Sequence, residues 1–172
     1  MSGKKLMLTL IALLGLHGVT MADLLVSEPE LADHKLVGEA KLEYFFWDIY
    51  RARLYAPNGQ YAPDENFALA ITYLRDFKGE DIAERSLDEI RQQGFDDKQR
   101  LMEWDEKMKA IFPDVQEGQS ITGVASNGVS QFYLDSNPIG AVDDAEFTRR
   151  FFAIWLGEKT SEPGMRRKLL NL

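Results

Sequence analysis

The spacing of apolar side chains along the chain predicts a sheet of strands with helices packed against it. Glu43–Tyr55 is rich in aromatic residues and contains no glycine or proline, which favours one long strand. Residues 36–42 alternate loosely, and they either extend this strand through a bend or form a hairpin around Gly38–Lys41. Phe67–Arg75 alternates in the same way and is predicted to be the next strand. The fold is therefore expected to be organised around the aromatic strand.

Two helices are predicted in the middle of the chain, because apolar residues recur there every three or four positions. The first spans Glu80–Gln93, has acidic residues in its first turn, and ends before Gly94. The second runs from about Asp97 to Ile111 and is stopped by Phe112-Pro113.

The last third of the chain predicts a hairpin followed by two helices. Residues 120–125 and 129–134 flank Asn127-Gly128, a dipeptide typical of a two-residue hairpin turn. Asp143 has the spacing of a cap before a phenylalanine-rich helix, and Ser161 can cap a short final helix. The whole pattern predicts a single α+β domain with an antiparallel sheet and helices laid against it.

The first 22 residues are predicted to be a secretory signal peptide. Lys4-Lys5 forms a short basic segment, Leu6–Leu16 is apolar, and Thr20-Met21-Ala22 offers small residues for a cut ahead of Asp23. An apolar run of eleven residues is too short for a comfortable membrane span, and the alternative is an uncleaved anchor. We therefore expect an exported, periplasmic protein with no stable membrane span once the signal has been removed.

The charge of the remaining chain, residues 23–172, disfavours some partners. Without Lys4 and Lys5 it has 18 basic against 28 acidic residues, a formal charge of −10. Nucleic-acid binding needs clustered basic residues, so no nucleic-acid partner is expected. The chain also has no cysteine, which excludes disulfides, a thiolate nucleophile and a thiolate metal site.

Few residues offer catalytic chemistry. The only histidine after the signal segment, His34, lies in a polar stretch and is interpreted as a surface residue. Acidic pairs such as Asp96-Asp97 lie at predicted helix starts, where they stabilise the helix dipole. The common nucleotide-binding and hydrolase motifs are absent from the sequence. We therefore expect no metal and no cofactor.

Arginine and tyrosine remain as candidates. Arg51 and Arg53 share one strand face, and Tyr73 and Arg75 share a face of the next predicted strand. A guanidinium group beside a tyrosine hydroxyl is a good receptor for a carboxylate or an enolate. The alternative is that these arginines pair with surface acids such as Asp48 or Asp76.

Several ordered segments resemble the chalcone isomerase-like proteins, in particular their bacterial, exported branch. They are Val37-Gly38, Trp47–Tyr55, Ala70–Arg75, Ile111–Val115, Gly140–Phe147 and Ile154–Gly157, followed by Pro163, Arg166, Leu169 and Leu170. The resemblance implies an open-faced β-sandwich, in which a large antiparallel sheet and a layer of helices enclose a cleft. Relatives include flavanone-forming isomerases and non-catalytic plastid proteins that bind fatty acids.

The resemblance can be carried to single positions. Tyr50 stands where the isomerases have a threonine and the fatty-acid binders a tyrosine. The isomerases' tyrosine and asparagine would fall near Ile82 and Glu89, which are different residues. The arginine shared by enzymes and binders has only Lys41 in its place, and lysine lacks the bidentate geometry. Chalcone isomerase activity is therefore not expected.

The combined reading is an exported, non-catalytic protein that binds a fatty acid or a similar amphipathic ligand in a cleft. Its predicted ligand-binding residues are Tyr50, Lys41, Tyr73 and Arg75, and no catalytic residue is assigned. One alternative is an intramolecular lyase or isomerase acting on a small phenolic or enone. Another is a structural or partner-binding module without a ligand. The sequence leaves the oligomeric state open.

Overall fold

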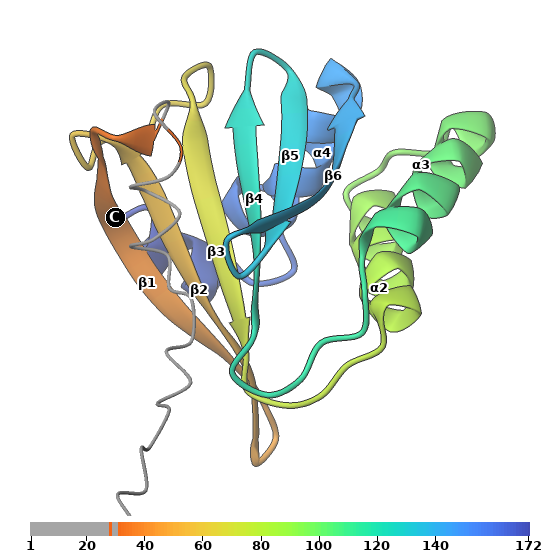
Figure 1. Cartoon of the computed structure of the whole chain (residues 1–172), viewed down its shortest axis with the longest axis horizontal. Coiled ribbons are helices and arrows are strands. Elements are labelled where there is room, and N and C mark those ends of the chain that lie inside the picture. Colours follow the sequence, from red (N-terminus) through yellow and green to blue (C-terminus); the bar gives the residue numbers. More distant parts are fainter. Residues whose placement is uncertain (1–27, 29–30) are drawn as a thin grey trace, which may run out of the picture.

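A computed structural model describes residue 28 and residues 31–172 of the chain. The predicted signal peptide, residues 1–22, lies outside the described residues. Six strands form one antiparallel sheet whose spatial order follows the sequence (Figure 1). They are β1 (His34–Tyr44), β2 (Trp47–Pro57), β3 (Phe67–Tyr73), β4 (Ser120–Ser126), β5 (Val129–Leu134) and β6 (Asn137–Asp143).

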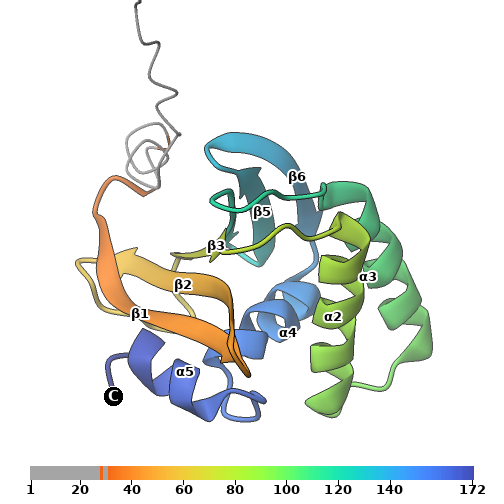
Figure 2. The ribbon, with the colours of Figure 1, turned by 90° about the horizontal axis from the view of Figure 1, so that it is seen from below.

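Within the described residues, four helices accompany the sheet. They are α2 (Gly79–Gln92), α3 (Lys98–Ile111), α4 (Ala145–Leu156) and α5 (Pro163–Leu169). In Figure 2, α4 and α5 lie across one face of the sheet, with α5 beneath β1 and β2. The pair α2 and α3 stands at the β6 end of the sheet, where α2 packs on α4 and α3 reaches β6. The predicted α+β architecture is confirmed.

The aromatic segment is divided differently from the prediction. Tyr44 pairs with Trp47 across a two-residue turn at Phe45-Phe46, so β1 and β2 form a long hairpin. The single strand predicted for Glu43–Tyr55 is therefore wrong, and so is a hairpin around Gly38–Lys41. The ladder that pairs β1 with β2 along their length outweighs the local preference of aromatic residues for an uninterrupted strand.

The connection between β3 and β4 is a helical excursion closed at its base. Phe77 and Val115 exchange two backbone hydrogen bonds, of 3.0 and 2.9 Å. The N–H of Gly79 donates to Asp114 Oδ1 at 2.9 Å, and a Cβ at Gly79 would lie 2.0 Å from the Phe112 carbonyl oxygen. The excursion therefore leaves and rejoins the sheet at one point, where α2 starts and α3 ends.

Two local features differ from the sequence-based expectation. Strand β6 was not predicted, because Pro138 and Gly140 interrupt its pattern; an edge strand tolerates both. The cap of α4 is Asp144 rather than Asp143, and Asp144 accepts from the N–H groups of Glu146 and Phe147. The other carboxylate oxygen of Asp144 accepts from Trp104 Nε1 at 3.0 Å. The cap therefore also holds α3 against α4.

The interior between sheet and helices is filled by aromatic rings. Its members are buried and make ring contacts with one another: Phe67, Trp104, Phe112, Phe132, Phe147, Phe151 and Phe152. Gly123 on β4 makes room for Phe152, whose ring would lie 3.0 Å from a Cβ at that position. The helices are therefore fixed to the sheet by a continuous aromatic core.

His34 is not a surface residue. It is buried at the start of β1, and its Nδ1 lies 3.1 Å from Asp33 Oδ1. The polar residues around it in the sequence suggested exposure, but β1 begins at His34 and carries it into the folded part of the chain.

Candidate functional site

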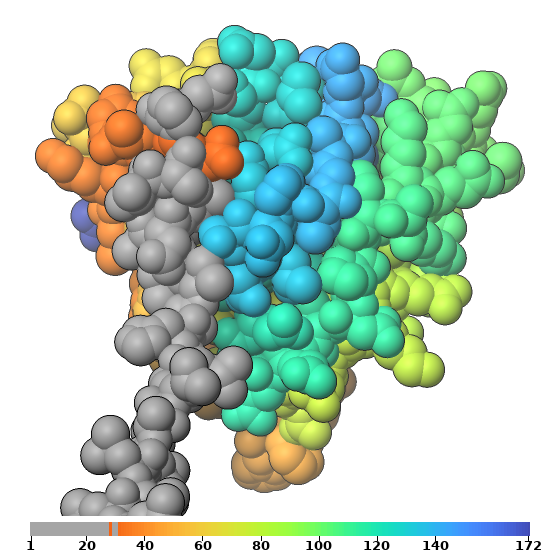
Figure 3. All heavy atoms as spheres, viewed as in Figure 1, coloured from red at the N-terminus to blue at the C-terminus, as the bar shows by residue number. Residues whose placement is uncertain are grey.

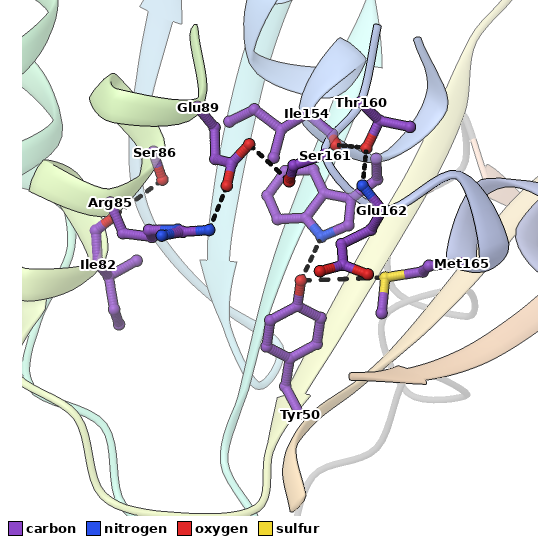
Figure 4. A network of polar contacts seen from close by, with 11 residues as sticks. Tyr50, Ile82, Arg85, Ser86, Glu89, Ile154, Thr160, Ser161, Glu162 and Met165 are labelled. Carbon is purple, nitrogen blue, oxygen red and sulfur yellow. Dashed lines mark hydrogen bonds and ion pairs between the residues drawn. The ribbon is translucent and has the colours of Figure 1, made fainter. Parts of the chain in front are cut away.

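A group of polar contacts that joins three elements surrounds the hydroxyl of Tyr50. This oxygen accepts a hydrogen bond of 3.0 Å from Trp155 Nε1, and its proton is directed at Met165 Sδ, 3.9 Å away. Tyr50 belongs to β2, Trp155 to α4 and Met165 to α5. Figure 4 shows the Tyr50 hydroxyl pointing from the sheet toward the helices.

Strand alternation explains why Tyr50 points inward. From Tyr50 onward, every second residue of β2 faces the helices, and the next two inward residues, Ala52 and Leu54, are buried. Tyr50 lies opposite Tyr73 of β3, and the two rings meet edge to face with centroids 6.4 Å apart. Two phenol groups therefore stand side by side on the inner face of the sheet.

Helix α2 brings a buried carboxylate to the same place. The side chain of Glu89 is only 5% exposed, and it forms an ion pair with Arg85 one turn earlier. Its second oxygen accepts from Ser161 Oγ at 2.8 Å. The sequence predicted that Ser161 caps the last helix. This prediction is wrong, because the Ser161 hydroxyl donates to Glu89 instead. Arg85 is 68% exposed and connects this buried group to the surface.

We call this group the Tyr50 site and define it by six residues: Tyr50, Tyr73, Arg85, Glu89, Trp155 and Met165. Figure 4 also shows Ile82 on α2, whose carbonyl oxygen accepts a hydrogen bond of 2.8 Å from Ser86 Oγ. Ile82 and Glu89 are the positions at which the family resemblance places the isomerases' tyrosine and asparagine. Of these two positions, Glu89 belongs to the Tyr50 site and carries a charge, whereas Ile82 carries no polar side-chain group.

The protonation of the two tyrosines follows from their burial. Burial raises the pKa of Tyr50 to about 12, although the hydrogen bond from Trp155 acts in the opposite direction. Burial also raises the pKa of Tyr73. The negative charges of Glu162 and Glu89 add to the rise in the pKa of Tyr50. Both side chains are neutral phenols at physiological pH, so they act as hydrogen-bond donors and not as bases.

The structure brings together two of the four predicted ligand-binding residues. Tyr50 and Tyr73 are neighbours, whereas Lys41 and Arg75 are exposed and lie apart from them. Lys41 lies on β1, opposite Arg51 of β2. Its Nζ contacts Glu43 at 2.5 Å and Asp48 at 2.9 Å. The turn at Phe45-Phe46 causes this placement, because it folds β1 back along β2.

Arg75 follows the end of β3, so the strand alternation that linked it to Tyr73 does not reach it. Its guanidinium carbon lies 4.0 Å from the ring centroid of Trp47. Lys41 and Arg75 are therefore not gathered with the two tyrosines, and their part in ligand binding stays a prediction.

Arg51 and Arg53 occupy the opposite face of β2, as the alternation predicted. They share one carboxylate: Arg51 Nε lies 3.5 Å from Glu39 Oε1, and Arg53 pairs with the other oxygen. Their partner is thus Glu39 and not Asp48 or Asp76. The arginine cluster on which the isomerase alternative depends is not assembled around the tyrosines.

Two surface hollows lie away from the Tyr50 site. The larger, about 480 Å³, lies beside α5 and is lined by Glu39, Gly164, Arg167, Lys168, Asn171 and Leu172. The other, about 360 Å³, is lined mainly by β4 and β5. At the Tyr50 site itself, Met165 contacts the hydroxyl that a ligand would approach.

Groups of potential metal ligands and long apolar helices are both absent from residue 28 and residues 31–172. Within that part of the chain, no group of three or more His, Asp or Glu side chains could hold a metal ion. In the same residues, no helix has the length and apolar character needed to cross a membrane.

Four residues of the site were not predicted from the sequence: Arg85, Glu89, Trp155 and Met165. The spacing of Arg85 and Glu89 indicates an ion pair on one helix face, but it carries no sign that the carboxylate is buried. Trp155 and Met165 are separated from Tyr50 by 105 and 115 residues, and no local pattern connects them.

The sheet, the helix layer and the inward tyrosines together define an open-faced β-sandwich of the chalcone isomerase type. The profile of the chalcone isomerase-like proteins matches residues 15–171, and the chain belongs to this family. Among solved structures, it is similar to a fatty-acid binding protein of Arabidopsis thaliana, with a TM-score of 0.62. That alignment has 13% identity and covers 81% of this chain and 87% of the plant protein. No curated protein sequence matches the chain.

Proposed function

We propose that the protein is a non-catalytic binder of an amphipathic carboxylic acid, such as a fatty acid, whose polar end is held at the Tyr50 site. One observation carries the proposal: the hydroxyl of the partly buried Tyr50 directs its proton at the thioether of Met165. Sulfur is a weak acceptor, so this donor is poorly satisfied. A carboxylate oxygen in the same position would accept a stronger, charge-assisted hydrogen bond.

The charges around the site suit a carboxylate at its outer side. Arg85 is largely exposed, whereas its partner Glu89 is buried. Part of the guanidinium group therefore faces solvent. A guanidinium group offers five N–H donors, and one carboxylate does not exhaust them. Arg85 can therefore bind a ligand carboxylate while it keeps its contact with Glu89.

The surroundings of the two phenols suit an apolar chain. The Tyr73 ring packs against Phe77 with centroids 5.5 Å apart, and Phe77 and Ile82 are only partly buried. Met165 has a flexible, unbranched side chain that can change rotamer without breaking a strong interaction. Its movement would expose the Tyr50 hydroxyl and make room for the first carbons of a ligand.

The protonation state of the two tyrosines disfavours catalysis. The raised pKa of Tyr50 and of Tyr73 keeps both phenols neutral, and a neutral phenol is a poor general base near neutral pH. The three arginines on which the isomerase alternative depends, Arg51, Arg53 and Arg75, lie on the other face of the sheet or at the hairpin end. The named activity of the Arabidopsis protein agrees with the proposal, but at 13% identity the likeness concerns the fold alone.

The proposal is tested by identifying what binds. Lipid extraction and mass spectrometry of the purified protein should recover a fatty acid or a similar amphiphile. Added long-chain fatty acids should raise the melting temperature, and their methyl esters should raise it less, because the ester removes the charge that Arg85 and Tyr50 recognise.

Two matched variants connect the binding to the site. Tyr50→Phe should weaken fatty-acid binding roughly tenfold, since it removes one charge-assisted hydrogen bond. Tyr55→Phe removes the hydroxyl of a partly buried tyrosine that packs on a separate cluster, and it should bind like the wild type. An empty extract together with an unchanged melting temperature would refute the proposal, and so would equal binding by Tyr50→Phe.

We also propose that residues 1–22 direct the protein to the periplasm. The support is the order of basic, apolar and small residues in this segment. Cell fractionation and sequencing of the mature N-terminus should find a periplasmic chain that begins at Asp23. A cytoplasmic chain that retains Met1 would contradict this part of the proposal.

A further inference from the structure

The end of the β1–β2 hairpin exposes four consecutive aromatic side chains. Tyr44 is 65% exposed, Phe45 80%, Phe46 97% and Trp47 57%. Figure 1 shows this hairpin extending past the ends of the neighbouring strands, and Figure 3 shows its atoms protruding from the body of the molecule. We call these four residues the aromatic tip.

The tip does not serve the stability of the fold. Phe45 has a φ of 54°, in the left-handed region that two-residue hairpin turns usually fill with glycine or asparagine. A phenylalanine there costs conformational energy, and its ring recovers little by burial because it is mostly exposed. Exposed apolar groups at a strained turn indicate a contact with something outside the domain.

Charged side chains of both signs stand directly behind the tip. Lys41 bridges Glu43 and Asp48, and the guanidinium group of Arg75 covers one face of the Trp47 ring. This collar carries two positive and two negative charges, so it does not favour a strongly anionic surface. Paired charges of opposite sign match the zwitterionic headgroups of a neutral phospholipid.

We propose that the aromatic tip inserts into a zwitterionic phospholipid surface. Phe45 and Phe46 at the apex enter the acyl boundary, while Tyr44 and Trp47 remain at the headgroup level, where tyrosine and tryptophan are favoured. The charged collar then limits the depth of insertion. The proposal does not depend on ligand binding at the Tyr50 site.

The shape and surroundings of the tip favour lipid over a second copy of the chain. The tip is convex, and a stable protein interface needs a closely fitting partner surface. The larger hollow described above is lined mostly by polar and charged groups, so it offers no apolar complement for the rings. A bilayer needs no preformed complement because lipids rearrange around an inserted side chain.

The inserted tip would stand close to the Tyr50 site. Trp47 and Tyr50 are three positions apart on β2, roughly 10 Å along an extended strand. An amphipathic ligand taken from the surface would therefore have a short distance to travel to the site.

The test uses the full chain and phosphatidylcholine vesicles with brominated acyl chains, which quench nearby tryptophan. Wild-type fluorescence should be quenched, and Trp47→Phe should lose most of the quenching while it still binds the vesicles, because Trp104 and Trp155 lie inside the fold. Phe45→Asn/Phe46→Ser should partition roughly 100-fold more weakly, about tenfold for each ring removed.

A matched control removes exposed apolar side chains elsewhere. Met102→Ser/Leu172→Ser changes residues that are 64% and 77% exposed, and it should bind vesicles like the wild type. Every variant keeps residues 1–22, so any contribution from that segment is the same in all of them. Anionic lipid and added salt should change binding little.

Three outcomes would overturn the proposal. The first is equal vesicle binding by the wild type and Phe45→Asn/Phe46→Ser. The second is quenching that is unchanged in Trp47→Phe. The third is a concentration-dependent dimer that Phe45→Asn/Phe46→Ser abolishes while the wild type shows no vesicle binding, since the tip would then contact a second copy. A negative vesicle result leaves fatty-acid binding at the Tyr50 site unaffected, so the two proposals fail separately.

Discussion

Trp155 Nε1 donates a hydrogen bond of 3.0 Å to the hydroxyl oxygen of Tyr50 and so ties α4 to β2. Tyr50→Phe leaves the indole N–H without this acceptor, and Trp155→Phe leaves the phenol without this donor. Each change should lower the free energy of unfolding by about 1–2 kcal/mol, which urea denaturation measures. The double variant should cost about 1 kcal/mol less than the sum of the single changes, because the two groups share one interaction.

Strict additivity of the two changes would contradict the hydrogen bond. Tyr55→Phe is the matched control, since Tyr55 packs against the separate cluster that contains Leu31 and Tyr133. Its effect on the free energy of unfolding should stay below about 0.5 kcal/mol.

Because Arg85 pairs with the buried Glu89, its replacement should destabilise the fold more than replacement of Arg91, whose partner is exposed. Arg85→Ala leaves Glu89 with only the Ser161 hydroxyl, and it should destabilise the fold by about 1–3 kcal/mol. Arg91→Ala breaks a pair with the exposed Asp88 on the same helix and should cost less than about 0.5 kcal/mol. Similar unfolding free energies for the two variants would show that Glu89 does not need its partner.

The raised pKa of Tyr50 predicts a loss of stability at alkaline pH. Below about pH 10 the phenol is protonated in both states, so its contribution to the free energy of unfolding does not change with pH. Above its ordinary pKa of 10.0 it ionises in the unfolded chain first, and stability falls until the folded-state pKa of about 12 is reached. The slope for one proton is about 1.4 kcal/mol per pH unit.

Tyr50→Phe should lose this part of the slope, which unfolding curves recorded between about pH 9 and 11 would show. Tyr73, whose pKa burial also raises, should keep a similar slope in that variant. Identical pH dependence in the wild type and Tyr50→Phe would argue that the phenol is less buried than described.

Substitution of Gly38 and of Gly164 by alanine should have very different effects on stability. A Cβ at Gly38 would lie 2.2 Å from the carbonyl oxygen of Lys168 and 2.5 Å from that of Leu169. Gly38→Ala must therefore push α5 away from β1, and it should destabilise the fold by about 2 kcal/mol or more. Gly164→Ala on α5 has only Arg167 at 4.0 Å and should be neutral or stabilising by up to about 1 kcal/mol. Thermal unfolding compares the two.

The parts of the fold that depend on local pattern could be predicted. The 3.6-residue spacing of α2 and α3 and the Asn127-Gly128 turn gave elements close to the observed ones. Asp97 caps α3 by accepting from the N–H of Arg100, at the helix start that the sequence indicated. These features are determined by neighbours a few residues apart, so the sequence contains their cause.

The parts that depend on pairing between distant segments could not be predicted. The turn at Phe45-Phe46 has no glycine, and only the ladder between β1 and β2 reveals it. Likewise, the Tyr50 site joins residues from β2, β3, α2, α4 and α5. Strand alternation separated Tyr50 from Arg51 and Arg53, but it could not place Lys41 across the hairpin turn or Arg75 beyond the end of its strand.

The closed base of the α2–α3 excursion has a dynamic consequence. The chain leaves and rejoins the sheet at the paired residues Phe77 and Val115, and the two connections run side by side in Figure 1. A movement of the two helices about this pair would break no strand pair, but it would break the hydrogen bond from Trp104 to Asp144 and expose the Trp104 ring. Such an opening would part Glu89 from Ser161 and admit water to the inner face. Amide hydrogen exchange should report it as a cooperative step of lower free energy than exchange in β2 to β4.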